Sequence, residues 1–334
     1  MPPSSDEILH PGDLGALMAD PAADTGPEPL IIDLHAAFEA PADKAADTVA
    51  RLRERNRIVI GVRDDAERTH PLDDGVDLLV TSRHLDRCVQ AIRANPMAAQ
   101  VLVEVLRTTE HLPPADALIV ESLAYATLQG GPEHAAWLHA QRQRQAARLL
   151  SGRDDLVLLE RHDDRLQIRL NSPDTRNSLS AAMRDALADA FTLVAVDASI
   201  GAVEVTGNGP AFCAGGDLKE FGLAPDPATA HRIRLARMPA RYLLPRQDRY
   251  TFKLHGACIG AGIELPAFAG RVVARADARF RLPEVSMGLI PGAGGCVSIP
   301  RRIGRQRAAF LAITGEEIDA ARALAWGLVD AVES

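Results

Sequence analysis

The stretch His255-Gly-Ala-Cys-Ile-Gly-Ala-Gly-Ile-Glu-Leu265 indicates the fold more directly than any other part of the sequence. It follows residues 250–254, whose aromatic and β-branched side chains predict a strand, and it leads into an apolar segment typical of a helix. A glycine-rich turn between a strand and a helix exposes backbone N–H groups at the start of the helix. We therefore expect an α/β fold in which this turn holds a negatively charged group.

Another glycine-rich turn, Asn208-Gly-Pro-Ala-Phe-Cys-Ala-Gly-Gly-Asp-Leu-Lys219, comes earlier in the chain and is the first turn, so that the turn at 255–265 is the second. It follows the β-branched run 201–206 and precedes a segment that we also expect to be helical. Two such turns facing each other would direct two N–H groups at one point, as an oxyanion hole does. Neither turn carries the Gly-Lys-Ser/Thr of a P-loop or the Gly-x-Gly-x-x-Gly of a dinucleotide fold, so the sequence disfavours a phosphate-cradling site at these turns.

Two further motifs follow, Leu282-Pro-Glu-Val-Ser-Met-Gly-Leu-Ile-Pro-Gly-Ala-Gly-Gly295 and Thr314-Gly-Glu-Glu-Ile-Asp-Ala-Ala-Arg-Ala-Leu-Ala-Trp-Gly-Leu-Val-Asp330. With the four motifs in this order, the chain from about residue 155 to its end resembles the crotonase, or enoyl-CoA hydratase/isomerase, superfamily. The resemblance implies a spiral of ββα repeats and an acyl-CoA substrate, with no metal and no cofactor beyond the substrate's own coenzyme A. It also implies that the N–H groups of Gly216 and Ala261 hold the thioester oxygen. Glycine is usual at the second of these positions, but alanine also offers an N–H.

Two glutamates bear on the reaction. Glu264 lies in an almost wholly apolar helix start, where a carboxylate needs a partner or a purpose, and Glu284 follows a predicted strand. The resemblance implies that this pair holds one water, delivers its oxygen to the β carbon and passes a proton to the α carbon. A helix-dipole charge for Glu264 and a solvated side chain for Glu284 remain the alternatives. Pro266 removes a helical N–H, so the helix either begins late or is kinked there.

Coenzyme A is polyanionic, so an acidic protein must offer it local positive charge. Lys219, directly after the first turn, is the first candidate, followed by Arg176 and by Arg246 or Arg249. The resemblance places residues 171–180 along part of the coenzyme A site, and we add Ala214 to the expected contacts.

The composition excludes several classes of protein. The chain has 334 residues, 47% of them hydrophobic, and a net charge of −8, which disfavours a nucleic-acid binder or a protein of anionic membranes. No apolar run approaches the length of a membrane helix, and the N-terminus does not resemble a signal peptide, so we expect a cytoplasmic protein. The four cysteines are dispersed, which predicts buried thiols rather than a zinc site or disulfides.

The chain divides into three predicted parts: a flexible lead-in at 1–27, an α/β and helical region at 28–150, and the crotonase-like domain at 151–334. This third part should begin with a hairpin around Asp163-Asp164, and Ser180 is a candidate cap for the helix that we expect from Ala181. The second part begins with alternating strand and helix patterns, which predict a small parallel sheet. Helices are then predicted at 84–107, 114–129 and 133–150. Four histidines in this helical region show no metal-binding spacing, and we expect them to serve packing or the surface: His84, His111, His134 and His139.

The sequence departs from the family at both ends. It stops at Ser334, where family members continue with helices that cover the site and help build a trimer or a pair of trimers. We hypothesise that residues 84–150 supply that cover in a homo-oligomer; a packed appendage or a partner-binding module are the alternatives. The N-terminal extension also resembles that of the cofactor-independent dihydroxyphenylacetyl-CoA dioxygenase. The sequence keeps both glutamates that the resemblance assigns to hydration, Glu264 and Glu284, so hydration is the leading hypothesis; isomerisation, hydrolysis, oxygenation or a non-catalytic partner subunit are the alternatives. The acyl group is not indicated.

Overall fold

The computed structural model describes residues 7–15, 28–65, 68–144 and 155–333. Its largest sheet has the strand order β13-β10-β8-β7-β6-β5, in which every neighbouring pair is parallel except β5 and β6. The strands are β5 (Val157–His162), β6 (Arg165–Leu170), β7 (Ala202–Gly207), β8 (Tyr250–Leu254), β10 (Arg271–Arg275) and β13 (Ala331–Glu333). A smaller sheet holds β9 (Ala257–Ile259), β11 (Arg279–Arg281) and β12 (Ile318–Asp319). The expected hairpin is confirmed, with Asp163 at a φ of 54° in its turn.

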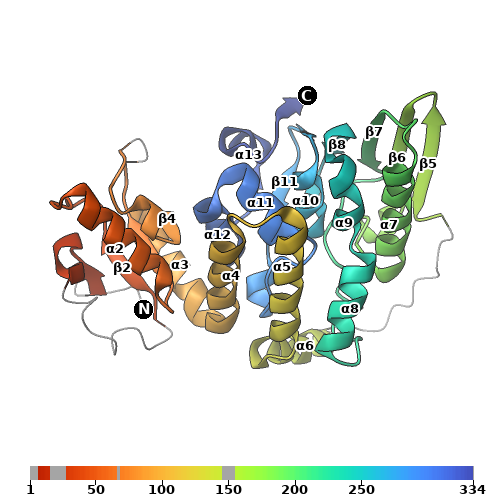
Figure 1. The fold of residues 1–334 in the computed structure, drawn as a ribbon. Helices are drawn as coiled ribbons and strands as arrows, with labels where there is room; N and C mark the ends of the chain where they lie inside the picture. The colour runs from red at the N-terminus through yellow and green to blue at the C-terminus, as the bar shows by residue number, and fades with distance from the viewer. Residues whose placement is uncertain (1–6, 16–27, 66–67, 145–154, 334) are drawn as a thin grey trace.

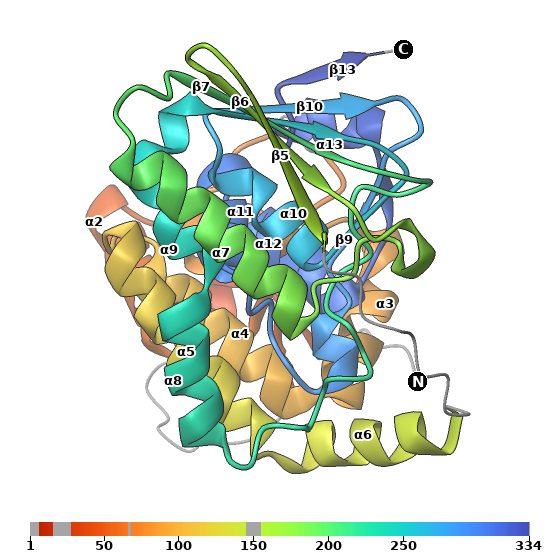
Figure 2. The same ribbon diagram turned by 90° about the vertical axis from the view of Figure 1, so that its right-hand side faces the viewer.

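The helices that follow these strands lie on one side of the large sheet, as Figure 2 shows for α7, α9, α10 and α11. Ser180 caps α7 as predicted, because its Oγ accepts the N–H of Met183 at 3.1 Å. The helices are α7 (Ala181–Val196), α8 (Pro227–Arg237), α9 (Pro239–Leu243), α10 (Ala261–Glu264), α11 (Gly295–Ile303), α12 (Arg305–Thr314) and α13 (Ala320–Trp326). Single 3-10 turns occur at η5 (Pro173–Thr175), η6 (Leu244–Arg249), η7 (Pro266–Phe268) and η8 (Glu284–Met287).

The helix expected directly after the first glycine-rich turn is absent. Residues 217–226 form turns, in which Asp217 accepts the N–H of Lys219 at 3.1 Å, and the next helix, α8, starts only at Pro227 behind its cap Asp226. Gly222, at a φ of 76°, and the proline before Asp226 explain why a helix does not continue here.

The N-terminal part contains the predicted parallel sheet, in the order β1-β2-β3-β4. Its elements are β1 (Ile8–Leu9), η2 (Pro11–Asp13), β2 (Leu30–Asp33), α2 (Ala42–Glu54), β3 (Val59–Val62), η4 (Asp73–Gly75) and β4 (Leu78–Val80). The structure corrects the expected lead-in at 1–27, because Ile8–Leu9 pairs with β2 and Leu14 is buried. Residues 1–6 and 16–27 lie outside the described residues.

Four helices connect the two sheets: α3 (Ser82–Ala94), α4 (Pro96–Thr109), α5 (Pro114–Gln129) and α6 (Pro132–Arg144). The single helix expected at 84–107 is wrong, since Asn95 leaves the helical conformation and Pro96 starts a new helix. Proline disfavours helical geometry in the residue before it, which accounts for the break. The helix at 114–129 is confirmed, and the predicted continuation of α6 to residue 150 falls outside the described residues.

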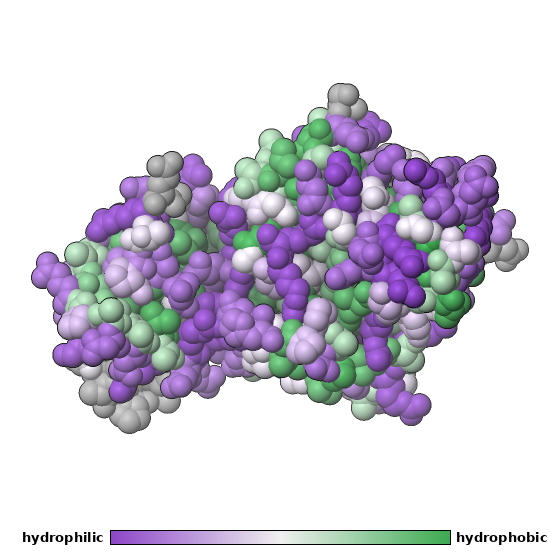
Figure 3. Space-filling view, turned by 45° about the horizontal axis from the view of Figure 1, so that its top comes forward, coloured by the Kyte–Doolittle hydropathy of each residue, from purple (hydrophilic) through white to green (hydrophobic). Residues whose placement is uncertain are grey.

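These connecting helices pack against the C-terminal part of the chain. Helices α4 and α5 contact α11, while α3 and α4 contact α12, so that α4 and α5 stand beside the C-terminal helices in Figure 1. A buried charge cluster joins the parts as well: Asp77, with no exposed surface, pairs with Arg107 of α4 and with Arg305 of α12. The helices are therefore built into the core, and hydrophilic residues predominate along the boundary with the N-terminal sheet in Figure 3.

Candidate active site

The two glycine-rich turns lie side by side. The N–H of Cys213 donates to the carbonyl of Ala257 at 3.2 Å, and the N–H of Ile259 donates back to the carbonyl of Cys213 at 3.0 Å. A side chain on Gly262 would collide with that same carbonyl, so the close approach requires glycine there. Figure 2 shows β9, which leads into the second turn, beside α10. All four cysteines are buried and free, as expected.

The structure brings Gly216 and Ala261 to one cavity of about 530 Å³. Ala261 is the first residue of α10, so its N–H precedes the first intrahelical hydrogen bond. Gly260, just before it, has a φ of 50°, which turns the chain sharply into the helix. One residue from each of the two turns thus belongs to the wall of a single cavity.

Glu264 lines this cavity from the end of α10 and is 2% exposed. Its Oε2 accepts the N–H groups of Ala293 and Gly295, at 2.7 and 2.9 Å. Helix α10 ends after one turn and η7 begins at Pro266, so the chain stops the α-helix before the proline and Glu264 keeps its place. Because both bonds go to one oxygen, Oε1 remains available to hold or release a proton.

Glu284 reaches the same cavity from η8. A side chain on Gly260 would collide with Oε1 of Glu284 and lie 3.6 Å from Oε1 of Glu264, so both carboxyl groups face the space over this glycine. Oε2 of Glu284 is buried without a hydrogen-bond partner among the described residues. Burial raises the pKa of both glutamates, and the nearby charge of Glu264 raises the pKa of Glu284 further. Such a pair favours sharing one proton near neutral pH.

A third buried carboxylate stands behind this pair. Glu121 of α5 has no exposed surface, and its two oxygens accept the N–H groups of Gly294 and Cys296, at 2.8 and 2.9 Å. Burial and the charge of Glu264 raise the pKa of Glu121, while its two backbone hydrogen bonds oppose that rise. Our sequence reasoning missed this residue. The signal existed, since a lone glutamate in the apolar helix at 114–129 is the same pattern that singled out Glu264.

Helix α5 also supplies Tyr125 to the cavity wall. Its ring lies against Gly292, where any side chain would collide with it, and the guanidinium of Arg234 sits 4.0 Å from the ring centroid. Arg234 comes from α8 and bonds Gln129 at 3.0 Å, which ties α8 to α5. The sequence-based analysis assigned no role to Tyr125 or Arg234.

The rest of the cavity wall is mainly apolar. It is formed by the segment after the first turn and by α8 and α9, including Phe221, Leu223, Ala224, Ala230, Ile233, Met238 and Pro239. Between the first turn and β8, residues 227–249 form α8, α9 and η6. An apolar chamber that ends in two carboxyl groups suits a ligand with an apolar body and one reactive polar end.

Comparison with known proteins identifies the family. Residues 161–334, more than half of the chain, match the enoyl-CoA hydratase/isomerase family. The chain belongs to this family. It is 35% identical over 176 residues to the 2,3-dehydroadipyl-CoA hydratase of Escherichia coli K12, which covers 53% of this chain and 68% of that protein.

Solved structures of the enoyl-CoA hydratase/isomerase family show the same fold. An enoyl-CoA hydratase from Mycobacterium smegmatis is 34% identical and aligns with a TM-score of 0.51, over 54% of this chain and 71% of its own. An enoyl-CoA hydratase/isomerase from Marinobacter aquaeolei is 30% identical, with a TM-score of 0.50 and coverage of 54% and 71%. The family match begins at Arg161, so Glu121 and Tyr125 enter the site from outside it.

The residues expected to contact coenzyme A lie apart from the cavity of Glu264. Lys219 and Arg176 are exposed, and neither they nor Ala214 are in its wall. Ala214 donates its N–H to the carbonyl of Arg176 at 3.0 Å, so these two at least are neighbours. The cavity wall contains other cations instead, Arg184 and Arg234.

Two negative findings apply to the part of the chain that the structure describes. It contains no group of three or more histidine, cysteine, aspartate or glutamate side chains arranged to hold a metal ion. None of its helices combines the length and the apolar character needed to cross a lipid bilayer. Within these residues, the cavity of Glu264 is lined by the two turns, by carboxyl groups, by the cations Arg184 and Arg234, and by a mainly apolar wall.

Proposed function

We propose that this protein is an enoyl-CoA hydratase-like enzyme that adds water across the α,β double bond of an acyl-CoA thioester. The observation that carries the proposal is the pair of buried carboxyl groups, Glu264 and Glu284, which face each other over Gly260. Gly216 and Ala261 share the same cavity wall, and the family relationship supplies the acyl-CoA class of substrate.

In the proposed reaction, the N–H groups of Gly216 and Ala261 hold the thioester oxygen, on which negative charge develops as the β carbon is attacked. One ionised carboxylate of the pair takes a proton from the bound water while the water oxygen bonds to the β carbon. The other carboxyl group, or the same water, gives a proton to the α carbon. One water is consumed, and the C=C π bond is replaced by one C–O and one C–H bond.

The raised pKa values of Glu264 and Glu284 support a reaction in which one carboxyl group acts as the base and the other as the acid. Burial favours the neutral form, and repulsion between two carboxylates favours one shared proton, so an acid and a base stand ready together near neutral pH. Glu264 suits proton transfer through Oε1, because its other oxygen is held by two N–H groups.

The remaining parts of the proposal concern the substrate and the assembly. We propose that coenzyme A is contacted outside the cavity of Glu264, by Lys219, Arg176 and Ala214. We further propose that α3–α6 replace the covering helices of other family members, because α5 contributes Glu121 and Tyr125 to the site. We also propose that the protein is cytoplasmic and that identical chains assemble into a trimer or hexamer.

The test follows the ultraviolet absorbance of the conjugated thioester when the protein meets crotonyl-CoA and a bulkier enoyl-CoA. We expect absorbance loss, oxygen from labelled water in the product, and at least a ~100-fold lower kcat in Glu264→Gln and in Glu284→Gln. Glu204→Gln is the matched control, since this exposed carboxylate on β7 pairs with Lys253. Turnover without labelled oxygen would instead indicate isomerisation. Binding of coenzyme A without turnover of any enoyl-CoA would favour another acyl-CoA reaction or a partner subunit.

A further inference from the structure

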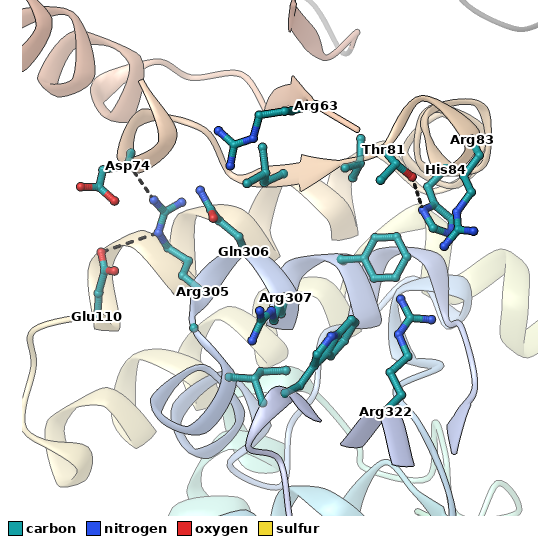
Figure 4. A pocket seen from close by; sticks show the side chains of 16 residues that line it. Arg63, Asp74, Thr81, Arg83, His84, Glu110, Arg305, Gln306, Arg307 and Arg322 are labelled. Atoms are coloured by element: carbon teal, nitrogen blue, oxygen red, sulfur yellow. Dashed lines mark hydrogen bonds and ion pairs between the residues drawn. The ribbon is translucent and has the colours of Figure 1, made fainter. Parts of the chain in front are cut away.

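A second cavity, of about 560 Å³, lies where the N-terminal sheet meets the C-terminal helices (Figure 4). It shares no lining residue with the cavity of Glu264. One wall comes from the carboxyl ends of β3 and β4 and the start of α3, and the other from α12 and α13. The carboxyl ends of parallel strands are the common ligand-binding edge of α/β sheets.

The wall of this cavity is strongly basic. It contains five arginines but only two acidic residues, Asp74 and Glu110, in a chain whose net charge is −8. Two of the arginines are matched by buried or half-buried carboxylates, since Arg63 pairs with Asp73 at 2.7 Å and Arg305 with Asp77 at 3.1 Å. These two hold the walls together.

The positive charge of the other three arginines is balanced by fewer carboxylates. Arg83 and Arg307 make no ion pair with any carboxylate among the described residues. Arg322 shares the single carboxylate of Glu316 with Arg87, so two cations meet one anion. Figure 4 shows Arg83 on the upper wall and Arg307 and Arg322 on the lower one. Cations thus border the cavity from both parts of the chain.

The wall also contains a histidine, His84, whose pKa is lowered. Burial lowers the pKa of His84, and the charges of Arg83, Arg322 and Arg87 lower it further, against the opposing effect of Glu316. The ring is held in place by a 2.8 Å hydrogen bond to Thr81. The space therefore favours anions and disfavours a further cation.

The cavity also offers flat apolar surface and an open helix start. Arg322 and Arg307 lie 4.4 and 5.5 Å from the centroid of the Trp326 ring, which is itself half-buried. Helix α12 begins beside them without a side-chain cap, behind Gly304, whose φ is 84° and which has open space around it. The first N–H groups of this helix add to the attraction for an anion.

We propose that this cavity binds a phosphate-bearing anion of nucleotide size, with its phosphates on Arg83, Arg307 and Arg322 and its planar part near Trp326. The volume is within the range of small-molecule sites, and guanidinium groups bind phosphate oxygens in a bidentate manner. Two sources share this chemistry: a free nucleoside diphosphate and the nucleotide end of coenzyme A. The proposal does not depend on the reaction at Glu264.

Trp326 provides the readout. The chain has two tryptophans, so Trp137→Phe leaves Trp326 as the sole reporter. Titration of this full-length variant with ADP, and separately with coenzyme A, should give a saturable change of fluorescence that weakens as salt is added. Calorimetry on the unaltered protein provides the second measurement.

The decisive variant is Arg83→Ala/Arg307→Ala, because both side chains are exposed and the fold does not depend on them. Loss of two charge-assisted contacts should weaken binding by about 10-fold or more. Arg165→Ala, an exposed arginine on β6 outside this cavity, should bind normally. Equal affinity in the double variant, or no saturable signal with either compound up to millimolar concentration, would overturn the proposal.

The two titrations also separate the sources. A response to ADP alone assigns the site to a free nucleotide. A response to coenzyme A that the double variant abolishes assigns it to the nucleotide end of that molecule. Because binding is measured without turnover, failure of the hydratase assay leaves this result intact.

Discussion

Glu121 and Glu264 hold alternate N–H groups of one short stretch, residues 293–296, at the start of α11. Glu264 accepts the first and third, and Glu121 accepts the second and fourth. Four successive backbone donors are thus satisfied by two carboxyl groups from different parts of the chain. The position of Glu264 within the site consequently depends on a helix that lies outside the family match.

Glu121→Gln should lower kcat by about 10- to 100-fold, because an amide leaves one buried N–H of this stretch without an acceptor, at a cost of about 1–3 kcal/mol. The KM for crotonyl-CoA should change little. The charge of Glu121 raises the pKa of Glu284, so the limb of the pH–rate profile that reports this pair should move to lower pH in the variant. An unshifted profile would reduce Glu121 to a structural role. Glu104→Gln, on the exposed face of α4, is the control.

Glu284→Gln should stabilise the protein above neutral pH. Burial raises the folded-state pKa of Glu284 above its unfolded value, so the folded state binds more protons, and wild-type stability falls as pH rises between these two values. Glutamine cannot ionise and escapes this loss. Thermal melts at pH 4.5 and pH 8 should show the variant gaining about 1–2 °C relative to wild type at the higher pH for each ~1 kcal/mol. A constant difference across this range would contradict the assignment.

Gly260→Ala should abolish activity even if the protein still folds. The new Cβ would displace Oε1 of Glu284, and the positive φ adds backbone strain of about 1–2 kcal/mol. Gly304→Ala is a matched control, since its φ is also positive but open space surrounds it. Comparable melting temperatures with loss of enoyl-CoA turnover only in the Gly260 variant would support the reasoning. Equal turnover in both variants would refute it.

Tyr125→Ala should widen the apolar chamber and favour larger acyl groups. The ring forms part of the wall against Gly292 and below Arg234. We expect the ratio of kcat/KM for a bulky enoyl-CoA over crotonyl-CoA to rise several-fold, with Tyr125→Phe close to wild type. If both variants lower the two values equally, the ring supports the fold and does not select the substrate.

Local patterns predicted much of this structure. The hairpin, the Ser180 cap, α5 and the parallel N-terminal sheet all depend on residues close together in sequence, and all are present. The break at Pro96 is also a local signal, which the helical periodicity on either side masks. The helix expected after the first turn is absent because Gly222, at a φ of 76°, and Pro225 interrupt that segment, and these are local signals as well.

Some residues of the candidate site could likewise be predicted from the sequence, and others could not. Motifs brought Glu264 and Glu284 to notice, and the structure places them around one glycine. The apolar stretch around Glu121 indicates a buried carboxylate, but not that one of its partners lies 173 positions further along the chain. Such a contact follows from packing of α5 on α11, which sequence periodicity alone does not predict.

That separation also sets an order of events during synthesis. Helix α5 emerges from the ribosome 173 residues before Gly294, the first residue that Glu121 binds. At ~5–20 residues per second, its carboxylate and apolar face wait roughly 10–35 s for their partners. The nascent chain therefore carries an unfinished helical unit throughout this interval, and the cavity of Glu264 closes only once residues 293–296 have been made.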